Sequence, residues 1–135
     1  MSRLHLTTFQ IGTPRKRGEG VRIGTVRFLP RGVPKKDYAK RDYFDIWFPI
    51  LAPSRDLIHS YKGKESDAHA RKTFFSRYRR ELRSNADSRQ AMQLLTALAR
   101  HTPLCIGCYC EDESQCHRSV LLMELNRVAA ELPPT

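Results

Sequence analysis

The alternation of apolar and polar positions along the chain predicts four extended segments. It is clearest in residues 21–29, where every second side chain is apolar apart from one slip in the middle, as in a half-buried strand. Residues 43–51 are rich in aromatic and β-branched side chains but include Pro49, and sheets tolerate proline mainly at an edge. Less regular apolar runs predict further strands at 3–11 and 103–110.

Helical periodicity dominates between these segments and near the end of the chain. Three long helices are predicted at 66–84, 87–100 and 114–130, where apolar side chains recur every three or four residues. A shorter helix is expected after Ser54, a good N-cap residue, and another at 35–40, with a proline just before it. The side chains expected to face the core are Phe75, Tyr78, Leu82, Ala91, Leu94, Leu95, Leu98, Leu121, Leu125 and Val128.

The order of these elements predicts the fold class. Helices separate the later strands, which is typical of α/β proteins with a small, largely parallel sheet flanked by helices. At 135 residues the chain is long enough for one core and too short for two full-sized ones. We therefore expect residues 1–135 to form a single compact α/β domain.

The net charge of +10 is concentrated in the first third of the chain. Residues 1–41 contain eleven Lys or Arg side chains and two acidic ones. Residues 101–135 contain only two Lys or Arg side chains and five acidic ones. Such a bias suits phosphate groups or nucleic acid as partners. A solvated basic surface is an equally common outcome, because these cations do not follow one helix face.

The same composition predicts a location. No apolar run approaches the ~20 residues needed to cross a bilayer, and the first residues lack the apolar core of a signal peptide. We therefore expect a cytoplasmic protein without a membrane segment. In that compartment the four cysteines are expected as thiols, metal ligands or transient redox partners, not as a disulfide framework.

Residues 103–119 hold the densest chemistry of the chain, with all four cysteines, a histidine and an arginine. The segment is predicted to run from a strand through a polar turn into a helix, a layout that places anions or reactive thiols at strand ends. Cys105 and Cys108 have the spacing of half a zinc site. A regular strand would point them to opposite faces, which favours packing as small buried hydrophobes over zinc.

Cys110 follows the predicted strand, and Cys116 falls in the first turn of the last helix if Asp112 or Ser114 caps it. A helix start lowers the pKa of a thiol through its free N–H groups and its dipole. Cys116 is therefore the candidate reactive thiol and Cys110 its candidate resolving partner, unless both only pack. His117 is a candidate base or ligand, although the ~100° step between helical neighbours argues against a direct pair with Cys116.

A candidate anion site combines Arg118 with the backbone N–H groups of Ser114–His117. Arg27 and Arg31 flank the end of the second predicted strand. They would reach the same crevice if that strand and 103–110 are parallel neighbours. The alternative is structural, with each arginine holding a loop through carbonyl groups or nearby carboxylates.

Four segments of the chain resemble one known family. They are Val26–Val33, Ile50–Ser54, Phe75–Leu82 and Cys110–Arg118, and in order they resemble the YeaO-like branch of the DUF488 family over roughly residues 3–128. The chain departs from the family pattern at Val26, where an aspartate is usual, and at Leu29, where a tryptophan is usual.

The resemblance implies a Rossmann-like α/β domain of a bacterial or archaeal cytoplasmic protein. DUF488 is a family of unknown function, so the resemblance implies no established reaction, cofactor or substrate. The segments that match the family's motifs contain the site residues that the resemblance implies: Arg27, Arg31, Tyr78, Cys116, His117 and Arg118.

Three function hypotheses remain open. The first is a small α/β protein, whether an enzyme or only a binding protein, that binds a phosphate-bearing small molecule at the anion site, with Cys116 as candidate nucleophile or redox thiol. The second is nucleic-acid binding through residues 1–41 and the arginine-rich helix 71–83, although aromatic side chains for stacking are scarce in the basic loop. The third is a metal or redox module built on Cys105, Cys108, Cys110, Cys116 and His117.

Overall fold

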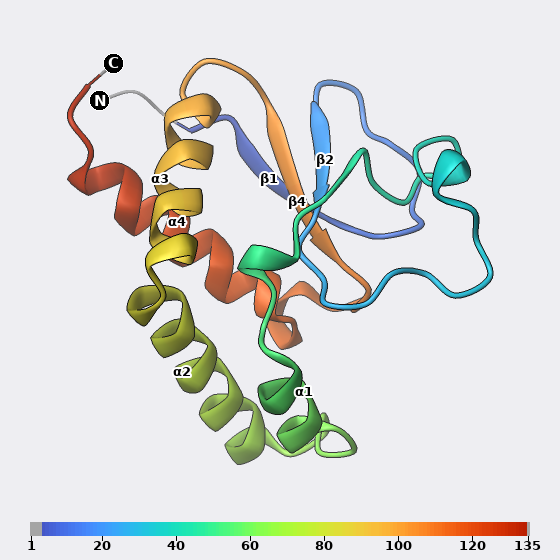
Figure 1. The fold of residues 1–135 in the computed structure, drawn as a ribbon, viewed down its shortest axis with the longest axis vertical. Helices are drawn as coiled ribbons and strands as arrows, with labels where there is room; N and C mark the ends of the chain where they lie inside the picture. The colour runs from blue at the N-terminus through green and yellow to red at the C-terminus, as the bar shows by residue number, and fades with distance from the viewer. Residues whose placement is uncertain (1–3, 135) are drawn as a thin grey trace.

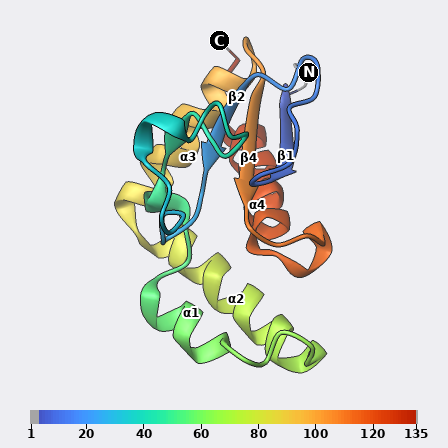
Figure 2. The same cartoon turned by 90° about the vertical axis from the view of Figure 1, so that its right-hand side faces the viewer.

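Four parallel strands form one sheet (Figures 1 and 2). They are β1 (Leu6–Gln10), β2 (Val21–Gly24), β3 (Ile46–Trp47) and β4 (Leu104–Cys108), in the order β1-β4-β2-β3. In the parallel register, Leu104 lies opposite both Leu6 and Val21. The last strand in the sequence therefore lies between the first two, and the carboxyl ends of all four strands meet at one edge of the sheet.

This computed structural model describes residues 4–134 and confirms the predicted α/β class with a small, parallel sheet. Residues 1–3 and 135 lie outside the described part, so the two ends of the predicted domain and the first residue of the predicted strand 3–11 fall there. None of the helices formed by residues 4–134 combines the length and the apolar character that a membrane span requires.

Helices begin where a side chain can satisfy free backbone N–H groups. The hydroxyl of Ser54, the carboxylate of Asp67 and the amide oxygen of Asn85 accept hydrogen bonds at the starts of the first three helices. The α-helices are α1 (Arg55–Tyr61), α2 (Ala68–Ser84), α3 (Ala86–Ala99) and α4 (His117–Glu131), and three short 3-10 helices span Lys35–Asp37, Pro49–Leu51 and Glu113–Gln115.

Two clusters of buried side chains lie against the sheet. The larger joins Ile23 and Ile106 to apolar residues of all four helices, with α4 packed on β4 and β1. The smaller contains Phe9, Phe44, Cys105 and further residues of the segments after β1 and β2. Helices α1 and the first half of α2 extend past the carboxyl edge of the strands (Figure 1), which places them beside the segments that follow β2 and β4.

The second strand is shorter than predicted, because β2 ends at Gly24 and residues 25–29 leave the sheet. Its neighbour β4 ends at Cys108, and β3 contributes only two residues to the pairing. Residues 25–29 therefore find few backbone partners with which to extend the hydrogen bonding of the sheet. They leave the sheet and pass over its carboxyl edge instead.

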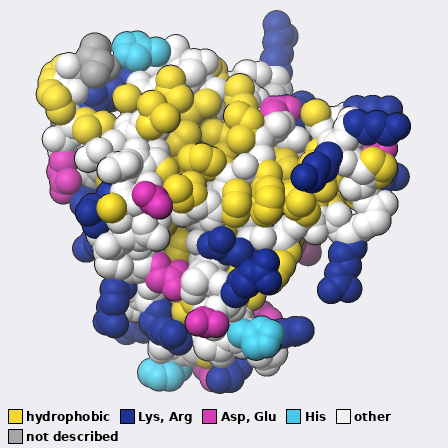
Figure 3. Space-filling view, viewed as in Figure 1, with side chains coloured by type: hydrophobic (Ala, Val, Ile, Leu, Met, Phe, Trp, Pro, Cys, Tyr) yellow, Lys and Arg dark blue, Asp and Glu magenta, His cyan; other side chains and the backbone are white. Residues whose placement is uncertain are grey.

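The predicted core face of α3 is also partly wrong. Leu94 is 61% exposed and Leu98 45% exposed, whereas Met92 and Ala99 are fully buried. Helix α3 packs against both α2 and α4, so the face that carries Met92 and Ala99 turns inward. Leu94 and Leu98 remain on the surface. Figure 3 shows hydrophobic side chains spread across the middle of one face of the molecule. On α2, Phe74 is buried and Phe75 only partly, while Leu121, Leu125 and Val128 of α4 are buried as predicted.

Candidate functional site at the carboxyl edge of the sheet

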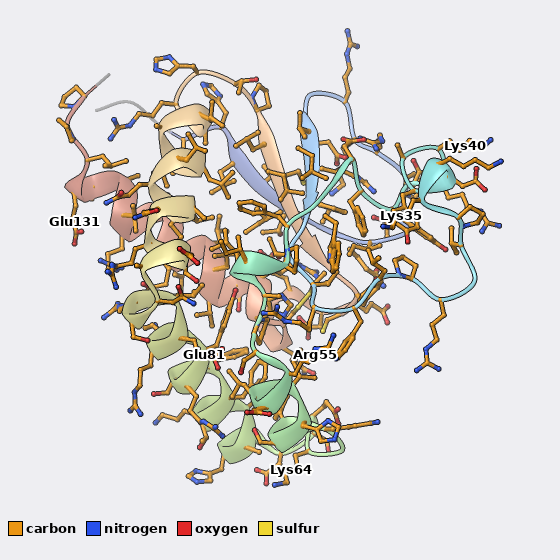
Figure 4. The ribbon with its side chains drawn as sticks, viewed as in Figure 1. Lys35, Lys40, Arg55, Lys64, Glu81 and Glu131 are labelled. Atoms are coloured by element: carbon orange, nitrogen blue, oxygen red, sulfur yellow. A yellow bond between two sulfur atoms is a disulfide. The ribbon has the colours of Figure 1, made fainter. Side chains whose placement is uncertain are left out.

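A pocket of about 570 Å³ opens at the carboxyl edge of the sheet. Its lining comes from residues 26–31 after β2, from 58–65 at the end of α1, and from 108–117 between β4 and α4, with Pro53 and Phe74 completing it. Most of the lining surface is apolar, and charged groups lie among it. In Figure 4, α1 runs from Arg55 near the sheet toward Lys64 at the far end of this region.

The structure brings five of the eight predicted site residues to this pocket. Arg27, Arg31, Cys110, Cys116 and His117 all line it. The parallel pairing of β2 with β4 explains why the arginines after one strand meet the cysteines after the other. Within residues 4–134, the lining does not include the other three, Ser114, Tyr78 and Arg118.

Cys108 and Cys116 form a disulfide (Figure 4), whereas Cys105 and Cys110 are free thiols, as expected for all four. In this oxidised state the partner of Cys116 is Cys108, and the role of Cys110 as resolving partner stays a prediction. Strand alternation would place Cys108 opposite Cys105, yet both belong to the same buried cluster. Cys108 is the last residue of its strand, so it faces the start of α4, where Cys116 lies.

Cys105 behaves as the packing prediction expects. Its side chain is fully buried, and the Thr7 hydroxyl donates a hydrogen bond to its sulfur at 3.3 Å. Burial raises the pKa of this thiol. Cys105 is therefore a structural thiol outside the pocket lining.

Three sulfur atoms form a cluster among the residues that line the pocket. The Sγ atoms of Cys108, Cys110 and Cys116 all lie within 4.8 Å of one another. Cys110 is a free and exposed thiol, whereas the two bonded cysteines are each only 1% exposed. Once the disulfide is reduced, these are the residues that could hold a thiolate-binding metal such as Zn²⁺ or Cu⁺, and Cys105 lies outside their group.

The side chain of His117 contacts that of Cys116 directly. The sequence-based prediction that these two side chains would point apart is therefore wrong. Cys116 is the N-cap of α4 and has extended backbone angles, φ −113° and ψ 149°, so the helical step of ~100° between side chains does not apply to it. The Nδ1 atom of His117 lies 3.7 Å from the Sγ atom of Cys116.

The contact made by the second ring nitrogen of His117, Nε2, determines which nitrogen carries the proton. Nε2 lies 2.7 Å from the carbonyl oxygen of Thr25, and a carbonyl only accepts, so in the neutral ring Nε2 holds the proton. Burial lowers the pKa of His117 to about 4, because a charged ring would be poorly hydrated there. At neutral pH, Nδ1 is therefore a free acceptor that faces Cys116.

Cations line the walls of the pocket. Arg27 is anchored by Nε and Nη2, which donate to the carbonyl oxygens of Pro53 at 3.1 Å and Ala52 at 3.2 Å. Arg31, which is exposed, also lines the pocket. Lys62 also lines the pocket, and it was not among the predicted residues because nothing in the sequence shows that α1 crosses this edge.

The remaining predicted residues lie around the site and bond to protein groups. The Arg118 guanidinium is 4% exposed and donates from Nη1 to the sulfur of Cys108 at 3.1 Å and to the carbonyl of Cys110 at 2.6 Å. The exposed Ser114 hydroxyl donates to the Asp112 carboxylate at 2.8 Å. The fully buried Tyr78 donates its hydroxyl to the carbonyl of Leu51, and burial raises its pKa well above the ordinary value. Roles of Arg118, Ser114 and Tyr78 in ligand binding stay predictions.

Nucleic-acid binding by the basic segments also stays a prediction. Several of their cations make ion pairs with carboxylates: Arg15 with Asp45 at 2.6 Å, Arg22 with Glu19, and Arg83 with Glu124 at 2.8 Å. Paired cations of this kind have less charge to offer a phosphate backbone.

Comparison with known proteins identifies a family for this chain. No solved structure matches the chain. Over 108 residues it is 31% identical to the uncharacterized protein YeaO of Escherichia coli K12, a match that covers 80% of this chain and 85% of that protein. The sequence model described as the active DUF488-N3 subclade matches residues 6–128. The family model and this relative together show that the chain belongs to the DUF488 family.

Proposed function

We propose that this protein binds an anionic, phosphate-bearing small molecule in the pocket at the carboxyl edge, and that Cys116, once reduced, is its reactive thiol. The observation that supports this most is the convergence of Arg27 and Arg31 with Cys116 and His117 on one pocket lining. A phosphate-bearing ligand would enter with its charge toward the arginines and its body against the apolar walls.

The charge of the lining favours an anion. Among the lining residues, Arg27, Arg31 and Lys62 are cationic and Glu65 is the single acidic residue. Arg27 is already held by two carbonyl groups, so little side-chain entropy is lost when it meets an anion. The apolar part of the lining, with Phe28 and Tyr109, suits a ligand that has a planar or apolar body, as a nucleotide does.

The surroundings of Cys116 favour a thiolate after reduction. Cys116 is the N-cap of α4, a helix of 15 residues, and a helix start stabilises negative charge. The free Nδ1 of His117 is placed to accept the thiol proton at 3.7 Å. A thiol with this activation is a nucleophile or a redox group, and the first role makes the protein an enzyme.

The anion preference can be measured on Cys110, which is the exposed free thiol of the oxidised protein and lines the same pocket. The probes are iodoacetate, which is negatively charged, and iodoacetamide, which is neutral. We expect the ratio of their rates at Cys110 to exceed that of a small reference thiol and to fall in Arg31→Gln. Lys72→Gln, which changes an exposed lysine of α2, is the matched control and should keep the ratio. A ratio equal to the reference thiol's would refute the anion site.

The reactive thiol needs a separate measurement on reduced protein. In the Cys110→Ser variant, carboxamidomethylation of Cys116 is followed by mass spectrometry across pH 5 to 9. We expect a half-maximal rate well below pH 8, moved to higher pH by His117→Gln. A Cys116 that titrates like an ordinary thiol near ~8.5 would remove the activated-thiol part.

The three-sulfur cluster supports a second candidate function, a metal or redox module. Cys108, Cys110 and Cys116 lie within 4.8 Å of one another, and three thiolates bind soft metals well. After anaerobic reduction and incubation with Zn²⁺, we expect one equivalent of bound zinc in the wild type and in Cys105→Ser, but not in Cys110→Ser. Less than half an equivalent in the wild type would argue against a metal module. A cytoplasmic location, which we also propose, would supply the thiols that keep this cluster reduced.

A further inference from the structure

We propose that Cys110 is a thiol-exchange site, at which small external thiols of the glutathione type reduce the buried Cys108–Cys116 disulfide through an internal relay. The proposal rests on the proposed function, because the relay would decide when Cys116 is free to react. It assigns to Cys110 a substrate class, small thiols, and a modification, a transient mixed disulfide.

Accessibility is the first argument. Cys108 and Cys116 are each 1% exposed, whereas Cys110 is exposed at the pocket. Thiol–disulfide exchange requires a thiolate to reach one of the bonded sulfurs. An external thiol meets Cys110 at the surface, whereas the two bonded cysteines border the pocket but are almost wholly inaccessible.

Proximity is the second argument. The sulfur of Cys110 lies within 4.8 Å of both bonded sulfurs. The backbone at Cys110 is held in place, because Arg118 donates to its carbonyl oxygen at 2.6 Å. A rotation of the Cys110 side chain is therefore a small movement compared with the opening that an external thiol would need.

The buried cation Arg118 decides which sulfur leaves. Its Nη1 lies 3.1 Å from the sulfur of Cys108, and its Nε atom has no hydrogen-bond partner in the described structure. Among residues 4–134, Arg118 makes no ion pair with a carboxylate. A cation that is 4% exposed is stabilised by an adjacent anion, and the thiolate of Cys108 would be that anion.

These positions define a balanced sequence of exchanges. The Cys110 thiolate attacks the sulfur of Cys116, so the Cys108–Cys116 bond breaks, the Cys110–Cys116 bond forms, and Cys108 leaves as a thiolate beside Arg118. An external thiolate then attacks the now accessible sulfur of Cys110, which forms a mixed disulfide and releases Cys116 as a thiolate.

A second external thiolate attacks the mixed disulfide and regenerates Cys110. In total, two external thiols are oxidised to one disulfide, the protein gains two thiols, and the protons of the external thiols pass through solvent to the protein thiolates. The reverse sequence, with an external disulfide as oxidant, would re-form the buried bond.

The test uses the full oxidised chain with reduced glutathione as the probe. Samples are quenched with acid at intervals, alkylated with N-ethylmaleimide and mapped by mass spectrometry. We expect reduction of the disulfide in Cys110→Ser to be at least about tenfold slower than in the wild type, since the relay is gone. Cys105→Ser, which removes a fully buried thiol outside the cluster, is the matched control and should react at the wild-type rate.

A second variant tests the relay without kinetics. In Cys108→Ser, the two remaining cysteines of the cluster should form the Cys110–Cys116 disulfide, which peptide mapping detects directly. The relay is overturned if Cys110→Ser is reduced as fast as the wild type, if Cys108→Ser lacks this bond, or if the purified protein holds a metal on three thiols instead of a disulfide. Because the anion preference is measured on oxidised protein, it would survive a failed relay, and the two proposals are separable.

Discussion

The Nδ1 atom of His117 lies 3.7 Å from the sulfur of Cys116, and the opposite nitrogen of the same ring lies 2.7 Å from the carbonyl oxygen of Thr25. The carbonyl fixes which nitrogen holds the proton. The ring also packs edge-on against Tyr78, with 5.4 Å between ring centres. His117 is therefore held neutral by its burial and oriented by the end of β2, and this arrangement has a consequence for stability.

We expect the protein to lose stability as the pH falls from 6.5 toward 4. Burial lowers the pKa of His117 in the folded state to about 4 from its ordinary value of 6.5, so the unfolded chain binds an extra proton in this window. By linkage, this proton uptake leaves the free energy of unfolding unchanged well above pH 6.5. It lowers the free energy of unfolding by about 2 kcal/mol between pH 7 and pH 5. Urea unfolding at several pH values measures this slope.

The matched variants are His117→Gln and His69→Gln, the second at an exposed position of α2. His117→Gln should have a flatter profile between pH 7 and 5, whereas His69→Gln should keep the wild-type slope. A His117→Gln protein with an unchanged slope would show that another group is responsible.

A buried carboxylate holds three helix-borne arginines together. Glu124 is 2% exposed and makes ion pairs with Arg83 at 2.8 Å, Arg127 at 3.0 Å and Arg79 at 3.4 Å. We expect Glu124→Gln to lower the free energy of unfolding by about 2 kcal/mol, since charge-assisted hydrogen bonds are lost in a buried place. Glu131→Gln removes a carboxylate that is 67% exposed and should cost at most about 0.5 kcal/mol. Equal effects of the two changes in urea unfolding would contradict the importance of burial.

Some parts of the fold follow from strong local patterns. In α4, apolar side chains at Leu121, Leu125 and Val128 recur on one face, and that face is buried. In α3 the sequence offers apolar residues on two faces, and contacts with α2 and α4 decide that Met92 turns inward while Leu94 stays exposed. Such a choice depends on the neighbouring helices, which a single helix pattern does not contain.

The site shows the same division. The meeting of Arg27 and Arg31 with the cysteine segment follows from one rule, that parallel strands end at the same edge. The disulfide does not follow from such a rule, because it depends on how the chain leaves β4 at Cys108 and enters α4 at Cys116. Lys62 reaches the pocket through the placement of α1, which long-range packing determines.

Tyr78 is expected to stabilise the wall of the site through its hydroxyl. This side chain is fully buried and donates to the carbonyl of Leu51, which is also buried. Tyr78→Phe should lower the free energy of unfolding by about 1–2 kcal/mol, because the carbonyl is left without its partner. Tyr61→Phe removes a longer hydrogen bond of 3.4 Å at an exposed position and should have little effect. If both variants unfold at the same urea concentration, the buried hydrogen bond is not stabilising.

Gly20 allows β2 to approach the residue that precedes β4. A Cβ atom at this position would lie 2.0 Å from the carbonyl oxygen of Pro103, a backbone atom that cannot rotate away. Gly18 has nearly the same backbone angle, φ +81° against +82°, but a Cβ there would meet nothing within 4 Å. The pair therefore separates the cost of a positive φ from the cost of steric overlap.

Gly18→Ala should destabilise the protein by about 1 kcal/mol, the cost of a left-handed conformation for a residue with a Cβ. Gly20→Ala should cost about 1–3 kcal/mol more, because the overlap forces the β2–β4 pairing apart. Urea unfolding of both variants gives the difference, and hydrogen exchange at the Val21 amide, which donates to Pro103 at 3.4 Å, locates it. Equal destabilisation would mean that the chain relaxes around Gly20 at no cost, contrary to a close approach that the sheet requires.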